Sequence, residues 1–261
     1  MDTKRDSEKV FNLNHMEPPE PATEAQSISR ACDFLRQARF TNFVLLSNAS
    51  NYTFLATLVK DEIELKAIYK PRRGEIPLWD FPDGTLYKRE YAAFVLSQAL
   101  QWHLVPPTVI RDGPYGIGSV QWFVDAKGGT RYFSQVKDAR VLKKVALFDY
   151  LVNNADRKLG HFLEGQDGRL WLVDHGLTFN AVPKLRTVLW DFSGETVPDE
   201  LLEDVSALQV KLGREKRLRG DLLRLIDRFE LEALESRIKS VIAQPVFAHP
   251  TSRRSVPWPW Y

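Results

Sequence analysis

The chain has 261 residues and a formal net charge of +2, so its bulk charge gives no reason to expect a nucleic-acid partner. Hydrophobic residues make up 44% of the chain, which is enough for a substantial core, but no apolar run approaches the roughly 20 residues needed to cross a bilayer. Cys32 is the single cysteine, so no disulfide can form within the chain. These features predict a globular, cytoplasmic protein, and they leave its oligomeric state open.

The first part of the chain predicts a small antiparallel sheet. Residues 1–26 are charged, contain prolines and lack the apolar segment of a secretory signal, so we expect them to be mostly disordered. A helix is predicted over residues 27–39, with Ser27 as its N-cap. Three strands joined by short polar turns follow, over residues 43–46, 52–59 and 63–69.

The next part adds one helix and two strands to this sheet. Residues 71–85 are rich in proline and glycine and are predicted to form a loop. A helix follows over residues 86–100, and two further strands are predicted over residues 108–111 and 118–124. We therefore expect an N-terminal lobe over residues 27–125.

The second half of the sequence is mainly helical. Apolar residues recur with helical spacing over residues 139–152, 197–212 and 217–242. These patterns predict a helical C-terminal lobe over residues 126–248. Residues 249–261 form a tail that we expect to pack on the body of the protein. The whole pattern predicts an α+β fold of two lobes with a cleft between them.

Two aspartates follow apolar segments of the second half. Asp156 lies in the polar run N-N-A-D-R-K-L-G-H, where a carboxylate beside Arg157 can accept or orient the proton of a substrate hydroxyl. Asp174 ends an apolar segment and precedes a His-Gly pair, a setting that suits a magnesium ligand. His161 is a candidate metal ligand or phosphate contact. The structural alternatives are the end of a helix, an ordinary turn and a buried structural histidine.

Lys70 ends the third predicted strand, so its ammonium would point into the cleft between the lobes. Phosphoryl transfer requires a cation at this kind of position, on the phosphates of the nucleotide. Glu90, on the following helix, would hold the ammonium in place, and Glu75 in the preceding loop is its competitor. A solvated lysine and an exposed glutamate are the structural alternatives.

The turn between the first two strands is a candidate phosphate-binding loop. It has the sequence S-N-A-S-N and includes Ser47, Asn48 and Ser50. Phosphate-binding loops usually contain glycine, because it lets the backbone approach the phosphate closely. Small hydroxyl and amide side chains can partly take that role, but the same residues also form ordinary hairpin turns.

The ordered set of motifs resembles the phosphatidylinositol 3-/4-kinase-like branch of the protein-kinase-like fold, and it is most similar to small bacterial members of that branch. The run N-x-D-R is also shared with HipA-type toxin kinases and type II phosphatidylinositol 4-kinases. The motifs that carry the resemblance are Y-K-P (69–71), G-E-I-P-L-W-D-F-P-D-G-T-L (74–86), R-E-Y-A-A (89–93), V-P-P-T (105–108), N-A-D-R-K-L-G-H (154–161) and L-V-D-H-G-L-T-F (172–179).

The resemblance implies a two-lobed protein-kinase-like fold and an ATP site between the lobes. Lys70 would bind the α- and β-phosphates, with Glu90 as its partner. The strand over residues 119–124 would lead into the hinge between the lobes. The adenine would bind to the hinge backbone at Gln121, Trp122, Phe123 and Val124.

The resemblance also implies the catalytic and metal-binding roles. Asp156 would be the catalytic aspartate, with Arg157 beside it, and Asp174 would bind magnesium. Related lipid kinases carry an asparagine metal ligand five residues after the catalytic aspartate, and this chain has His161 there. An imidazole is a less natural partner for magnesium than an oxygen.

These observations predict an ATP- and magnesium-dependent kinase that moves the γ-phosphate to a hydroxyl group. The sequence does not identify the acceptor, which would be a lipid, a protein or a small molecule. Two alternatives remain. His161 and the glycine-free turn would also suit a nucleotide-binding pseudokinase with a regulatory role, and the same fold could transfer AMP instead.

Overall fold

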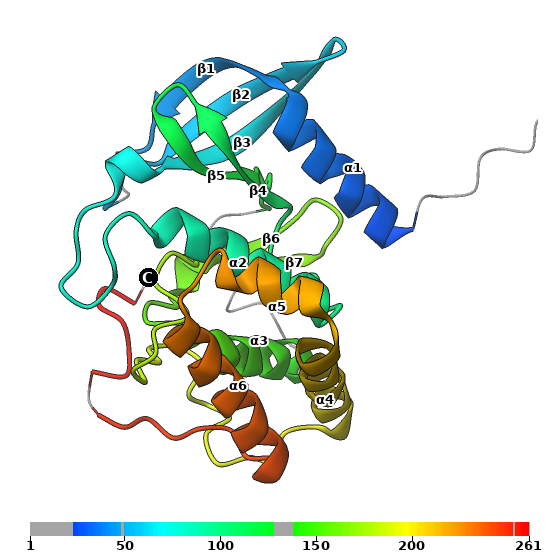
Figure 1. Cartoon of the computed structure of the whole chain (residues 1–261), viewed down its shortest axis with the longest axis vertical. Coiled ribbons are helices and arrows are strands. Elements are labelled where there is room, and N and C mark those ends of the chain that lie inside the picture. The colour runs from blue at the N-terminus through cyan, green and yellow to red at the C-terminus, as the bar shows by residue number, and fades with distance from the viewer. Residues whose placement is uncertain (1–22, 48–49, 128–137, 253, 261) are drawn as a thin grey trace, which may run out of the picture.

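The computed structural model describes residues 23–47, 50–127, 138–252 and 254–260. A five-stranded antiparallel sheet forms the N-terminal part of these residues, and helices dominate the C-terminal part (Figure 1). This arrangement confirms the expected α+β architecture. Among the described residues, no helix is long and apolar enough to cross a membrane.

The sheet has the strand order β1-β2-β3-β5-β4, and each neighbouring pair is antiparallel. β3 and β4 continue two residues beyond their predicted ends, β1 begins four residues earlier than predicted, β2 begins two residues later, and β5 begins and ends two residues earlier. The elements of this part are α1 (Glu24–Gln37), β1 (Arg39–Leu45), β2 (Phe54–Lys60), β3 (Ile63–Pro71), α2 (Leu86–Ala99), β4 (Thr108–Gly113) and β5 (Gly116–Trp122).

Helix α1 begins three residues earlier than predicted. The side chain of Thr23 accepts a hydrogen bond from the backbone of Gln26, whose side chain in turn accepts one from the backbone of Thr23. This capping box satisfies N–H groups that would otherwise lack partners at the helix start. Residues 24–26 therefore belong to α1 and not to a disordered segment, and residues 1–22 lie outside the described residues.

The C-terminal part contains one more helix than predicted. The pattern over 217–242 is divided at Asp227, whose side chain accepts a hydrogen bond from the backbone of Glu230 and starts a new helix. The elements are α3 (Ala139–Val152), β6 (Phe162–Glu164), β7 (Leu170–Leu172), α4 (Asp199–Arg214), α5 (Lys216–Leu223) and α6 (Arg228–Ala243).

The two faces of the sheet have different neighbours. Arg111 of β4 donates hydrogen bonds to the carbonyls of Leu35 (2.8 Å) and Ala38 (2.7 Å), so α1 and its end cover one face. Lys70 of β3 points to the other face, where it meets Glu90 of α2. Because side chains alternate along a strand, the sheet separates a packed face from a face that looks toward the helical part.

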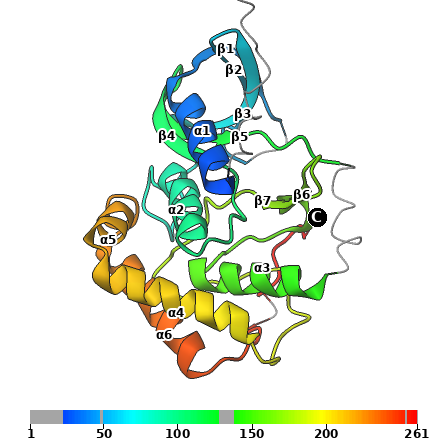
Figure 2. The ribbon, with the colours of Figure 1, turned by 90° about the vertical axis from the view of Figure 1, so that its right-hand side faces the viewer.

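Helix α2 lies between the sheet and the C-terminal helices (Figure 2). Arg89 is fully buried, and it donates to Glu230 of α6 (2.5 Å) and to the carbonyl of Thr178 (2.6 Å). One continuous hydrophobic core includes residues of the sheet, of α2 and of the C-terminal helices. Since the core runs through both parts, the boundary at residue 125 stays a prediction.

The C-terminal tail packs on the body, as expected. The carbonyl of Ser255 accepts hydrogen bonds from Thr187 N (3.0 Å) and from the indole of Trp190 (2.9 Å). The carbonyl of Trp260 accepts one from Leu159 N (3.0 Å), which lies in the loop after α3. The tail therefore supports the segment that carries Asp156.

Candidate active site

Three charged residues from distant parts of the sequence meet at the end of β3, beside α2 and the turn after β7. Lys70 at the end of β3 donates hydrogen bonds to Oε1 of Glu90 and to Oδ1 of Asp174, the latter over 2.9 Å. The other oxygen of Glu90 accepts a hydrogen bond from His175 N (2.9 Å). Glu90 therefore joins β3, α2 and the turn after β7 at one point.

Glu75, the competitor for Lys70, has a different partner. Its carboxylate accepts hydrogen bonds from Leu86 N (3.1 Å) and Tyr87 N (2.8 Å). These N–H groups begin α2 and have no carbonyl partner within the helix. Glu75 thus fixes the start of α2, while Glu90 pairs with Lys70.

Electrostatics keep Lys70 and Asp174 charged. Burial favours a lower pKa for Lys70, but the charges of Asp174 and Glu90 outweigh it and raise the pKa above its ordinary value. The Lys70 ammonium in turn lowers the pKa of Asp174, against the effect of burial. Half of the Asp174 side-chain surface remains exposed, so a ligand can reach its carboxylate while Lys70 holds one side.

Asp174 has a left-handed backbone with φ of 61°. This conformation is uncommon for a residue other than glycine and aims the side chain in a direction that regular structure does not provide. Both flanking peptides are fixed. Arg157 donates to the carbonyl of Val173 (2.8 Å), and Glu90 accepts from His175 N.

Asp156 lies on the loop after α3, where the Asn154 side chain accepts a hydrogen bond from its backbone N–H (3.0 Å). Oδ2 of Asp156 is 3.0 Å from the ammonium of Lys158. Burial nevertheless raises the pKa of Asp156, because it outweighs the opposing effect of Lys158. A partly buried carboxylate with a raised pKa is a better proton acceptor than an exposed one.

Arg157 was predicted to act in catalysis, and the structure shows that it also has a structural role. Its side chain is 0% exposed and donates to both oxygens of Asp149 over 3.0–3.1 Å, so it faces the core and not the cleft. It also donates to Nε2 of His175 (2.8 Å). Arg157 therefore connects α3 to the residues on either side of Asp174, and its catalytic role stays a prediction.

Asp149 is a site-supporting residue that sequence reasoning missed. It is fully buried in α3 and also accepts a hydrogen bond from the amide of Asn154 (2.9 Å). The signal was present in the sequence A-L-F-D-Y-L-V, because an aspartate stands among residues predicted to face the core. A buried charge requires a partner, and that partner is Arg157.

His161 lies beside Asp174, with its Nε2 3.4 Å from Oδ2 of the carboxylate. Burial lowers the pKa of His161 to about 4, against the attraction of Asp174, so the ring is neutral at physiological pH. Nδ1 accepts a long hydrogen bond from Lys158 N (3.4 Å). With Nδ1 as acceptor, the neutral ring carries its proton on Nε2, toward Asp174.

The turn predicted to bind phosphate connects β1 to β2 at the closed end of the hairpin. Ser47 and Ser50 are exposed there, and Asn48 lies outside the described residues. Tyr52 N donates to the carbonyl of Gly74 (3.0 Å), which ties the hairpin to the loop before α2. A Cβ at Gly74 would lie 2.2 Å from Cβ of Tyr52, so this approach requires glycine.

The predicted hinge is partly used by the sheet. The backbone N–H of Trp122 donates to Pro107 O (2.8 Å) and that of Phe123 to Lys66 O (3.3 Å). The side chain of Gln121 is buried and donates to Thr108 (2.9 Å). The backbone N–H groups of Trp122 and Phe123 are therefore already bonded within the protein. A backbone N–H donor to adenine from this stretch would have to come from Val124 or the residues after it.

Three apolar side chains form a surface on one face of the sheet that sequence reasoning did not identify, and we call this surface the roof. Val44, Leu55 and Ile68 are direct cross-strand neighbours on β1, β2 and β3. Direct neighbours share a face, and Ile68 shares the face of Lys70 two residues later. The three side chains are exposed or half-buried, so they provide an apolar surface beside the Lys70 ammonium.

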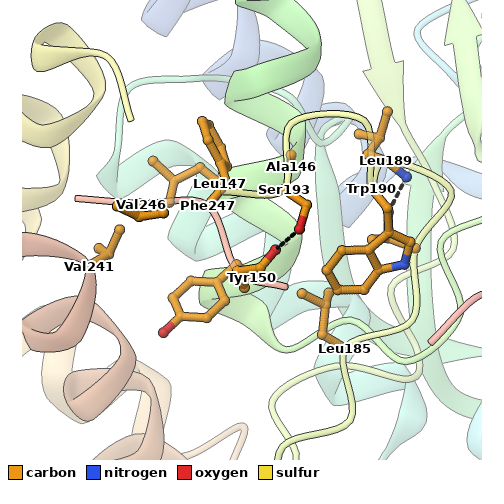
Figure 3. A pocket seen from close by; sticks show the side chains of 12 residues that line it. Ala146, Leu147, Tyr150, Leu185, Leu189, Trp190, Ser193, Val241, Val246 and Phe247 are labelled. Carbon is orange, nitrogen blue, oxygen red and sulfur yellow. Dashed lines mark hydrogen bonds between the residues drawn. The ribbon is translucent and has the colours of Figure 1, made fainter. Parts of the chain in front are cut away.

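An apolar cavity elsewhere in the helical part is not a candidate site. It lies between α3, residues 185–193 and the end of α6, and Tyr150, Trp190 and Phe247 line it (Figure 3). Its volume of about 20 Å³ leaves room for one water molecule at most. It is a gap in the packing of the core.

Comparison with known proteins places the chain in a family. No protein-family model matches the sequence. The chain is 39% identical to protein Rv2133c of Mycobacterium tuberculosis (strain ATCC 25618 / H37Rv) over an alignment of 250 residues, which covers 82% of this chain and 89% of that protein. The chain belongs to the Rv2133c family.

Solved structures show the fold of this member of the Rv2133c family. The structure of hydra Fam20 with sugar has a TM-score of 0.51 at 14% identity, covering 85% of this chain and 89% of that one. The Golgi casein kinase has a TM-score of 0.50 at 16% identity, with coverages of 85% and 75%. Its structure with Mn/ADP bound also gives 0.50, at 15% identity, with coverages of 85% and 76%. The chain therefore has a protein-kinase-like fold.

Proposed function

We propose that this member of the Rv2133c family is an ATP-dependent phosphotransferase of the phosphatidylinositol 3-/4-kinase-like type. It would move the γ-phosphate of ATP to a hydroxyl acceptor with the help of a divalent cation such as magnesium. The observation that carries the proposal is the meeting of Lys70, Glu90 and Asp174 at one point of a kinase-like fold. These residues come from three elements separated by up to 104 positions in the sequence.

The nucleotide would bind between the roof and the charged side chains of Lys70, Glu90 and Asp174. Val44, Leu55 and Ile68 would cover the adenine, and the ammonium of Lys70 would contact the phosphates. Glu90 holds the ammonium, so little side-chain freedom remains to be lost when ATP binds. The exposed serines of the β1–β2 turn would lie over the phosphates.

The donor set of the cleft fits a divalent cation that is shared with a nucleotide. Among the described residues, no group of three or more metal-ligating side chains occurs. Asp174 provides a half-exposed carboxylate, and phosphate oxygens and water would supply the other ligands, as is common for magnesium in phosphoryl-transfer sites. When bound, the cation would supply positive charge on the transferring phosphate.

Asp156 would orient the acceptor hydroxyl and receive its proton. Its backbone is fixed by Asn154, and its carboxylate stands beside Lys158, whose positive charge would stabilise the charge that develops on the transferred phosphate. Catalysis would then result mainly from positioning and electrostatics. Arg157 would act indirectly, by holding the turn at Asp174.

The Asp156→Asn variant tests this proposal, because it keeps the shape of the side chain and removes its basicity. We expect ATP to bind with unchanged affinity and phosphate transfer or ATP hydrolysis to be abolished. ATP labelled on the γ-phosphate and ATP labelled on the α-phosphate, incubated in parallel, distinguish phosphate transfer from AMP transfer. Turnover by Asp156→Asn at the rate of the unmodified protein would disprove the role of Asp156. If the unmodified protein binds ATP but turns over neither label, it is a pseudokinase.

A further inference from the structure

The pair formed by His161 and Asp174 has a separation that suits two ligands of one cation. His161 Nε2 and Asp174 Oδ2 are 3.4 Å apart. Two donors that stand at right angles, each about 2.1 Å from an octahedral cation, are about 3.0 Å apart. Binding a cation would therefore shorten the distance between Nε2 and Oδ2 by a few tenths of an ångström, which a small side-chain rotation provides.

The surroundings of His161 hold its ring in place. The side chain is 13% exposed, and the residue lies in a short 3-10 turn just before β6. The carbonyl of His161 accepts a hydrogen bond from Val173 N (3.1 Å), so its backbone is bonded to the residue next to Asp174. The two side chains therefore stand on backbone segments that are fixed to each other.

We propose that Nε2 of His161 binds the nucleotide-associated cation directly, beside the carboxylate of Asp174. This inference rests on the proposed function, because the nucleotide phosphates supply the remaining ligands. The site then has a mixed nitrogen and oxygen donor set. A nitrogen donor favours divalent transition metals over magnesium, weakly for Mn²⁺ and more strongly for later metals such as Co²⁺, so the site binds these ions more tightly relative to Mg²⁺ than an all-oxygen site does.

Binding requires a change of tautomer at His161. In the metal-free arrangement Nδ1 accepts the long hydrogen bond from Lys158 N, and Nε2 carries the proton. When Nε2 becomes a ligand, that proton moves to Nδ1 through solvent, and the 3.4 Å contact with Lys158 N is lost. A contact of this length is a weak hydrogen bond, so its loss opposes metal binding only slightly. The competing role of His161 is that of a hydrogen-bond donor to Asp174 that never binds metal.

Pulsed EPR of the full chain with Mn²⁺ and ADP distinguishes these roles. We expect hyperfine coupling of Mn²⁺ to ³¹P of ADP and to a nitrogen nucleus. In ¹⁵N-labelled protein with unlabelled ADP, the nitrogen coupling must become a ¹⁵N coupling, which excludes adenine as its source. His161→Asn should keep the ³¹P coupling and lose the nitrogen coupling. His103→Gln is the matched control, because His103 pairs with Gln98 and should leave both couplings unchanged.

Metal titrations of the ADP complex give a second readout. Replacing His161 by asparagine should weaken Co²⁺ binding by at least about tenfold, the loss of affinity that even residues outside the first ligand shell produce, and should weaken Mg²⁺ binding less. A ³¹P coupling without a protein nitrogen coupling in the wild type would overturn this inference and leave the proposed function intact. Absence of any nucleotide-dependent Mn²⁺ signal would overturn both.

Discussion

Arg157→Met removes the guanidinium that joins the loop after α3 to the turn at Asp174. Asp149 is 0% exposed, and it would keep only the amide of Asn154 as a partner outside its own helix. Removing one member of a buried ion pair typically costs about 3–5 kcal/mol, because the other charge is left without compensation. Domains are stable by roughly 5–15 kcal/mol, so this variant loses a large part of the free energy of unfolding.

A double variant separates this effect on stability from the effect on the site. In Asp149→Leu/Arg157→Met both charges are replaced by apolar side chains, and such replacements are often neutral or stabilising. We expect most of the stability to return. In the double variant the carbonyl of Val173 and the ring of His175 still lack the hydrogen bonds that Arg157 donates. The turn at Asp174 is then less well fixed, so we expect phosphate transfer to stay below that of the unmodified protein.

Urea unfolding of the wild type, both single variants and the double variant measures the coupling between the two residues. Arg217→Met is the control, because its side chain is 95% exposed and the change should stay within about 0.5 kcal/mol. The reasoning fails if the double variant is as unstable as Arg157→Met, or if it regains both stability and full transfer activity.

The remaining predictions concern Asp156 and the approach of the hairpin to the loop before α2. Lys158 lowers the pKa of Asp156, so Lys158→Met should raise it, and the acid limb of the pH profile of kcat should move to higher pH. An unchanged acid limb would contradict the role of Asp156 as proton acceptor. Gly74→Ala should lower stability by about 1–3 kcal/mol in thermal unfolding, because its Cβ would meet Tyr52 at 2.2 Å. Gly213→Ala has open space around it and should not destabilise the protein.

Local sequence patterns are sufficient to predict most of the helices and strands and the positions of some charged residues. Lys70 and Asp174 stand at the ends of short apolar segments, so their placement in a cleft could be predicted from strand ends and turns. The start of α1 at Glu24 was missed, although Thr23 and Gln26 already formed a capping-box pattern. Apolar spacing alone places the helix start at Ser27, because Ile28 is the first residue of the apolar face.

Contacts between distant segments could not be predicted from local patterns. Arg157 follows Asp156 directly, so proximity in sequence favoured a catalytic role, while its side chain turns toward Asp149 on the preceding helix. The hinge prediction had the same weakness. Whether a backbone N–H is available depends on strand pairing. Here Pro107, just before β4, accepts from Trp122, and Lys66 of β3 accepts from Phe123.

The backbone of Asp174 shows why the two halves of the candidate site depend on each other. A left-handed aspartate costs energy, and it persists because neighbouring contacts determine the conformation. One of these contacts comes from Glu90, the partner of Lys70, and the other comes from Arg157, the neighbour of Asp156. The proposed nucleotide side and the proposed acceptor side are thus fixed to the same peptide units. A substitution that loosens either side should displace Asp174 and reduce both metal binding and transfer, even when it touches neither ligand.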